Sequence, residues 1–133
     1  MNIKYNTVPV LRLTVAEKPT IRRLVAEILM ALGDPSPSSG TTDKMIHRIV
    51  KLAHVAKTRT IIIDGFQSLF YKNKTTAMHL SNLFVFLADR CDIVLIIPDL
   101  ESAKDLHDAF PKLSRRAQVT QSTTKSNSSQ RNS

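Results

Sequence analysis

The sequence has few of the residues on which disulfides, metal sites and base-stacking platforms depend. With one cysteine, Cys91, it can form no internal disulfide and no Cys-based zinc site. Aromatic residues make up 5% of the chain and Trp is absent, so stacking on single-stranded bases is poorly supported. The longest apolar run, residues 83–88, is far shorter than the roughly 18 residues of a membrane span. We therefore expect a cytoplasmic protein with no membrane partner, and neither a secreted scaffold nor a zinc finger.

The excess positive charge is concentrated near the C-terminus. The net charge is +8, but residues 112–133 hold five Lys or Arg and no acid, which leaves fourteen basic against eleven acidic residues in 1–111. Residues 120–133 are Ser, Thr, Asn or Gln at twelve of fourteen positions, a composition typical of disorder. We expect one domain over 1–119, a disordered tail over 120–133, and at most weak attraction to DNA.

Apolar periodicity predicts alternating strands and helices. Apolar residues recur at three-four spacing between Pro19 and Gly33, which predicts the clearest helix. The apolar runs within residues 60–64 and 93–97 are typical of strands buried in a parallel sheet. A weaker strand pattern covers residues 8–13. Further helices are predicted over 42–53, 75–89 and 101–110, and a Pro- and Ser-rich loop over 34–40.

This order of elements predicts an α/β fold with three parallel strands and right-handed crossovers. Ligands of such sheets collect at the carboxyl ends of the strands, which makes Asp64 and Asp99 the first positions to consider. A carboxylate after a buried strand suits a Walker-B-type aspartate, which holds Mg²⁺ beside nucleotide phosphates. A polar strand end that caps the next turn gives the same pattern and is the commoner explanation of an isolated run. From the residues alone, both interpretations of Asp64 stay open.

A phosphate-binding loop is missing from these 133 residues. That loop needs Gly, four residues, and then Gly-Lys followed by Ser or Thr, and Gly33, Gly40 and Gly65 fit no such pattern. The four histidines lie on predicted helices without a Ser or Cys in a nucleophile context, so no catalytic residue is predicted. Arg115 and Arg116 are either the basic start of the tail or arginines presented to a neighbouring subunit's nucleotide.

The ordered segments together resemble one family. A helix opens after Pro19 and Thr20 and closes on Ala-Leu-Gly-Asp-Pro at 31–35, and a second helix precedes the strand and turn Thr-Ile-Ile-Ile-Asp-Gly-Phe-Gln-Ser-Leu at 60–69. In this order and spacing, the chain from Pro9 to Arg116 resembles the TniB/TnsC transposition ATPases of the AAA+ class.

The resemblance implies a fold, a site and partners. The fold is a three-layer partial AAA+ domain, P-loop NTPase-like, with a parallel sheet flanked by helices and without the Walker A strand-loop and the C-terminal lid. The site places Mg²⁺ at Asp64, the sensor-1 region at Asp99 and arginine-finger candidates at Arg115 and Arg116. The family binds ATP between subunits, assembles on DNA, and recruits or activates a transposase. Its implied partners are therefore the transposase and other AAA+ subunits.

The chain departs from this family pattern in ways that bear on activity. The Walker A loop is missing, Gly65 stands where the family has a catalytic glutamate, and a polar tail follows instead of the last core strand and lid helices. The missing first strand is also expected to leave the edge of residues 93–97 apolar and unpaired.

Three interpretations follow from these departures. The first is a truncated TniB-like subunit that neither binds ATP tightly nor hydrolyses it alone, which leaves open whether the chain is an enzyme within an assembly. The second is a non-enzymatic interaction module that docks on a transposition ATPase or transposase assembly. The third is an unrelated small α/β binding domain.

Overall fold

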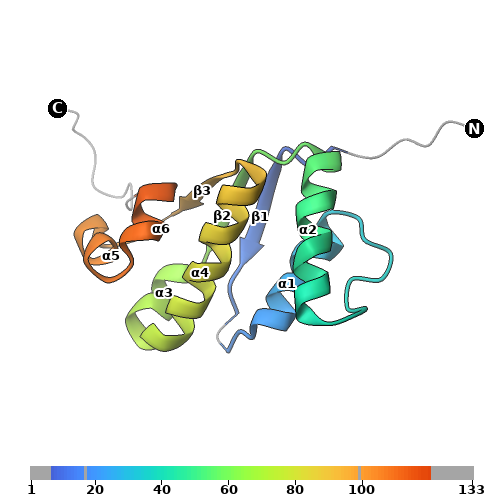
Figure 1. Ribbon diagram of the computed structural model, residues 1–133. Coiled ribbons are helices and arrows are strands. Elements are labelled where there is room, and N and C mark those ends of the chain that lie inside the picture. The colour runs from blue at the N-terminus through green and yellow to red at the C-terminus, as the bar shows by residue number, and fades with distance from the viewer. Residues whose placement is uncertain (1–6, 17, 99, 121–133) are drawn as a thin grey trace, which may run out of the picture.

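The computed structural model describes residues 7–16, 18–98 and 100–120, in which strands alternate with helices (Figure 1). The elements are β1 (Val10–Thr14), α1 (Ile21–Ala31), α2 (Thr42–Ala56), β2 (Thr60–Asp64), α3 (Phe66–Lys72), α4 (Lys74–Cys91), β3 (Val94–Ile97), α5 (Ala103–Ala109), α6 (Pro111–Arg116) and β4 (Ala117–Val119). The predicted α/β class with a parallel sheet is confirmed. None of the described helices is long and apolar enough to cross a bilayer. The predicted tail, apart from Thr120, lies outside the described residues.

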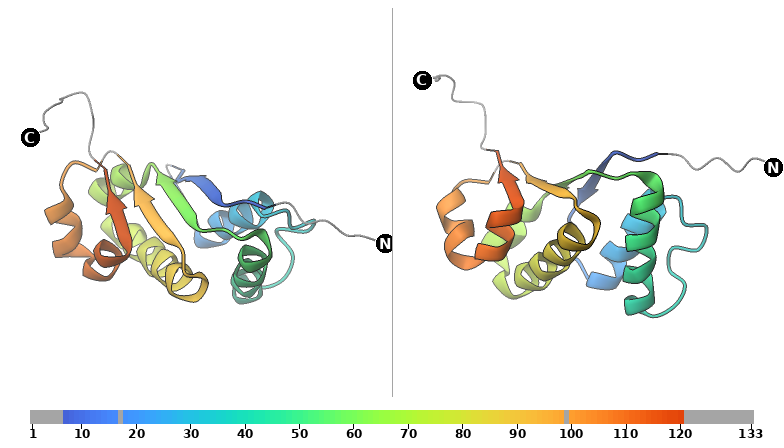
Figure 2. Two further views of the ribbon diagram at one scale, coloured as in Figure 1. Left: turned by 90° about the horizontal axis from the view of Figure 1, so that it is seen from above. Right: turned by 45° about the horizontal axis from the view of Figure 1, so that its top comes forward.

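The sheet has its strands in chain order, and this order places the helices on one side. The strands pair as β1-β2-β3-β4, and every pair is parallel. Because each strand is added at the same edge and crossovers between parallel strands are right-handed, the connecting helices fall on the same face. Figure 2 shows the strands as one layer with α1, α2 and α4 beneath it. The expected three layers are therefore two in the described part of the chain.

Burial alternates along the strands and confirms this arrangement. Every second residue of β1, β2 and β3 points to the helix-covered face. These six side chains are at most 3% exposed: Leu11, Leu13, Ile61, Ile63, Leu95 and Ile97. The residues between them point to the other face, where Val10 is 55% and Val94 42% exposed. Ile62 and Ile96 of the central strands are only half-buried on that face. We call this second surface the open face of the sheet.

The fourth strand corrects the prediction that residues 93–97 form an unpaired edge. β4 pairs with β3, with Ala117 opposite Leu95 and Val119 opposite Ile97. The Thr120 N–H also donates to the Ile97 carbonyl at 3.1 Å. The three-residue strand is too short to show any period in the sequence, and only its place beside β3 reveals it. The edge that we expected to be exposed is thus paired within the described part of the chain.

Two short helices, α3 and α6, are absent from the prediction, and each is separated from the preceding element by a single residue. α3 follows β2 after Gly65 alone, and Gly65 occupies its N-cap with φ +84°. Pro111, which follows the helix predicted over residues 101–110, is the first residue of α6. Proline suits that position because its missing N–H has no intrahelical partner there. The helices α3 and α6 place Phe70 and Leu113 in the core.

The loop between α1 and α2 is held by one buried carboxylate and two arginines. Asp34 accepts from the Ser36 N–H and from Arg48 Nε, both at 2.9 Å, and its side chain is 8% exposed. Arg22 Nη2 donates to the carbonyls of Ser38 and Gly40 at 2.8 and 2.9 Å. The hydrogen bond from Ser36 lowers the pKa of Asp34 from its ordinary value; burial opposes this effect and Arg48 adds to it.

Replacing Asp34 with asparagine should destabilise the protein more at neutral pH than in acid. A carboxyl with a lowered pKa stabilises the fold above its ordinary pKa, and this contribution is lost as pH falls through the folded-state value. We expect D34N to lower the free energy of unfolding by about 1–2 kcal/mol near neutral pH, with a smaller difference below about pH 4. Urea denaturation of both proteins at neutral pH and below about pH 4 measures the difference in the free energy of unfolding. An equal difference at both would contradict the role of the ionised carboxylate.

Candidate functional site

The candidate carboxylate lies where the sequence analysis places it, at the carboxyl end of a central strand. Asp64 is the last residue of β2, opposite Thr14 at the end of β1. It shares the open face with Ile62, two residues earlier, because strand side chains alternate between faces. The Asp64 side chain is 30% exposed, so β2 presents a carboxylate to solvent at the edge where α/β proteins bind ligands.

Asp64 already has a charged partner. Nη1 of Arg12 on β1 donates to Asp64 Oδ2 at 2.5 Å, and the Arg12 side chain is 64% exposed. A pair this exposed contributes at most about 1 kcal/mol to stability. The pair matters more for the local chemistry. The positive charge of the guanidinium offsets the negative charge of the carboxylate, and its N–H is hydrogen-bonded to one of the two carboxylate oxygens. Arg12 is absent from the predicted site, although a charged residue between Leu11 and Leu13 indicates an outward position beside the end of β2.

Position 65, directly after Asp64, has no room for a side chain. Gly65 has φ +84°, a left-handed conformation that residues with a Cβ rarely adopt. A Cβ built on Gly65 would lie 2.9 Å from the Val15 carbonyl oxygen. The backbone there is fixed, because the Val15 N–H donates to the Asp64 carbonyl at 2.8 Å. A glutamate after Asp64 would therefore require the backbone at Val15, just after β1, to move.

The other predicted site residues do not join Asp64. Arg115 and Arg116 end α6 immediately before β4, and Ala117 stands opposite Leu95 near the start of β3. They therefore lie at the amino-terminal edge of the parallel sheet, the edge opposite Asp64. Nη2 of Arg116 is 2.6 Å from Oδ1 of Asp89 on α4, whereas the exposed Arg115 has no ion pair among the described residues. Asp99 lies outside the described residues.

The remaining chemistry-bearing side chains form no second centre. All four histidines lie on helices, as predicted, and their side chains are exposed: His47, His54, His79 and His107. Within the described ranges, no three His, Cys, Asp or Glu side chains are grouped as metal ligands. Cys91 is buried at the end of α4, and burial raises the pKa of its thiol, which disfavours the reactive thiolate.

Comparison with known proteins identifies the family. The sequence profile of the family described as bacterial TniB protein matches residues 2–126, nearly the whole chain. The chain belongs to the TniB family. It is accordingly a transposition-associated protein, and the interpretation as an unrelated α/β domain is wrong. No curated protein matches the chain.

The described residues of this TniB-family chain do not by themselves fit the Mg–ATP that the resemblance implies. Mg²⁺ at nucleotide sites is usually held by one or two carboxylates together with the substrate phosphates. Asp64 supplies one such carboxylate, already paired with Arg12. The 133 residues hold no phosphate loop, and Gly65 holds no base. The roles assigned to Asp64, Asp99, Arg115 and Arg116 remain predictions.

Proposed function

We propose that this TniB-family protein works in DNA transposition as a binding component that neither binds ATP tightly nor hydrolyses it alone. It acts by contacting other members of the assembly, such as a complete ATPase subunit or the transposase. One observation carries the catalytic half of this proposal: Asp64 is paired with Arg12 and followed by a glycine whose backbone has no room for a glutamate.

Hydrolysis of ATP needs groups that the site does not present. The attacking water has to be oriented and deprotonated by a base in hydrogen-bond reach, and the phosphates have to be held by backbone amides and a cation. Asp64 is balanced by Arg12, and Gly65 contributes no side chain. These contacts instead fix the position of the end of β2. The Arg12–Asp64 ion pair and the hydrogen bond from Val15 to Asp64 join it to β1 and the residue that follows β1.

The open face of the sheet supports the binding half of the proposal. Parallel sheets are nearly always covered on both faces, since both faces of their strands are apolar. Here Val10 and Val94 are strongly exposed, and the side chains of Ile62 and Ile96 are half-buried beside them. This apolar surface suits contact with another protein of the assembly better than contact with water.

The proposed function predicts no response to Mg–ATP. We expect the purified chain to bind no fluorescent ATP analogue at micromolar concentration with Mg²⁺, to release no phosphate, and to keep its melting temperature within about 1 °C. Neither Asp64→Ala nor Arg12→Ala should change this. Micromolar binding that is lost in Asp64→Ala would show that Asp64 is a metal-site residue and would overturn the proposal.

The binding half is tested with the same preparation. We expect the tagged chain to capture a complete TniB-family ATPase or its transposase from purified components, without a requirement for ATP. Ile62→Glu, on the open face, should abolish capture, whereas Lys18→Glu, at an exposed position outside the strands, should not. Failure to capture either partner would remove the binding half and leave the result with Mg–ATP unaffected.

A further inference from the structure

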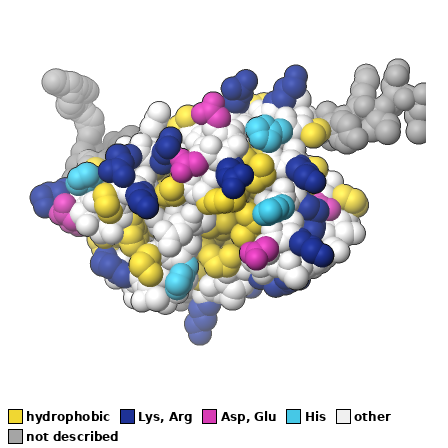
Figure 3. Space-filling view, viewed as in Figure 1, with side chains coloured by type: hydrophobic (Ala, Val, Ile, Leu, Met, Phe, Trp, Pro, Cys, Tyr) yellow, Lys and Arg dark blue, Asp and Glu magenta, His cyan; other side chains and the backbone are white. Residues whose placement is uncertain are grey.

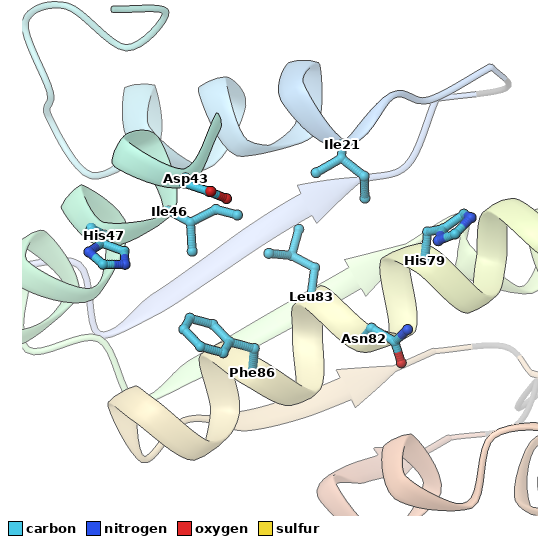
Figure 4. A pocket seen from close by; sticks show the side chains of 8 residues that line it. All are labelled: Ile21, Asp43, Ile46, His47, His79, Asn82, Leu83 and Phe86. Carbon is cyan, nitrogen blue, oxygen red and sulfur yellow. The ribbon is translucent and has the colours of Figure 1, made fainter. Parts of the chain in front are cut away.

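A groove lies between α2 and α4 on the helix-covered side, away from Asp64 and from the open face. Its volume is about 430 Å³. Eight residues of α1, α2 and α4 line it: Ile21, Asp43, Ile46, His47, His79, Asn82, Leu83 and Phe86. Figure 4 shows the side chains of Ile21, Ile46 and Leu83 pointing into the space between the helices. The floor is therefore apolar, and the exposed groups Asp43, His47, His79 and Asn82 form the rim.

The groove has walls of helical period. α2 contributes Asp43, Ile46 and His47, and α4 contributes His79, Asn82, Leu83 and Phe86, at steps of three and four residues. Residues at this spacing stand above one another on one face of a helix. Both helices connect parallel strands and so run in the same direction, which makes the groove a channel between two helices. A third helix fits such a channel by laying its own apolar stripe on the floor.

Charge at one end of the groove indicates the character of that helix. Lys51 follows His47 by one turn on α2, and Arg90 follows Phe86 by one turn on α4, with its guanidinium 5.1 Å from the centre of the Phe86 ring. Both are exposed, and neither makes an ion pair within the part of the chain that the structure describes. Figure 3 shows hydrophobic side chains in the hollow, bordered by basic, histidine and acidic side chains.

We propose that this groove binds an amphipathic helix of a partner protein, with its apolar stripe on Ile46 and Leu83 and its carboxylates opposite Lys51 and Arg90. The chain's own tail does not fit, because residues 121–133 hold no apolar side chain and two bases. A DNA backbone does not suit the groove either, because its phosphates would face the apolar floor. Phosphates are held by lysine and arginine, and the groove lining itself contains neither.

Synthetic peptides of about four helical turns, labelled with fluorescein, test the proposal. One carries leucines at helical spacing flanked by glutamates, and its matched control has lysine in place of every glutamate. In anisotropy titrations with the whole protein, we expect the acidic peptide to bind at least about tenfold more tightly than the basic one. The double variant K51E/R90E should reverse this preference, because it replaces both positive charges with negative ones. Both residues are exposed, so the fold is kept.

Matched variants separate groove binding from general attraction to a basic protein. K112E, on α6, removes an exposed lysine away from the groove and should leave both affinities unchanged. I46E should abolish binding of the acidic peptide, while circular dichroism verifies the fold. Equal binding of the two peptides, equal losses in K112E and K51E/R90E, or no binding of either peptide would overturn the proposal. A concentration-dependent dimer that K51E/R90E dissociates would instead identify a second copy as the occupant.

Discussion

Replacing Ile63 with asparagine should lower the free energy of unfolding by about 4 kcal/mol, whereas the same change at Ile62 should cost about 1 kcal/mol or less. The two residues are neighbours in β2 and are chemically identical. Ile63 is fully buried under the helices and Ile62 is half-buried on the open face. At position 63 the amide loses apolar packing and finds no hydrogen-bond partner, while at position 62 it stays in reach of water.

Urea denaturation followed by circular dichroism measures both free energies, and I61N serves as the matched control on the covered face. Ile61 is 2% exposed, so I61N should resemble I63N and not I62N. Equal large losses at positions 62 and 63 would mean that both faces of the sheet are covered in solution. The two-layer arrangement would then be wrong, and with it the open face that supports the binding half of the proposed function.

Gly65→Ala should lower the free energy of unfolding by about 2–4 kcal/mol. Two costs combine at this position. The backbone has φ +84°, which a residue with a Cβ adopts only under strain, and the new methyl would lie 2.9 Å from the Val15 oxygen. Gly33 separates these costs, because it has φ +91° with no atom within 4 Å of a built Cβ. Gly33→Ala should therefore cost only about 1 kcal/mol. Similar losses at the two positions would contradict the close approach of Val15.

Gly65→Glu extends this test to function. This change places an acidic residue after the strand aspartate, as in the transposition ATPases that the sequence resembles. We expect it to destabilise the chain at least as much as Gly65→Ala and to produce no phosphate release with Mg–ATP, because the turn has no room for the Cβ. Measurable ATP turnover by a folded G65E protein would contradict this expectation and would show that the glycine at position 65 is what prevents hydrolysis.

The general fold was predictable because its signals are local. The apolar runs of β2 and β3 and the periodic faces of α1, α2 and α4 are visible in stretches of the sequence, and all of these elements are present. The short elements were not predictable. α3 has seven residues and β4 has three, and neither length shows a period. β4 exists because the free edge of β3 pairs with the next segment that reaches it.

The candidate site was predictable only in part, for the same reason. The position of Asp64 at a strand end follows from the run of isoleucines before it. Its partner Arg12 lies 52 residues earlier in the chain and meets it through the register of β1 with β2. That register is a property of the packed sheet, since a shift by one residue would turn Arg12 to the covered face.

By itself, the sequence of this TniB-family protein determined the α/β class, the place of Asp64, the glycine that follows it and the absence of a phosphate-loop motif from the 133 residues. Those features depend on residue type and on order along the chain. Tertiary structure alone decided that the helices cover one face, that Arg12 neutralises Asp64, and that α2 and α4 enclose an apolar groove. These depend on strand order, register and crossover hand, which arise when distant segments pack together and bury their apolar faces.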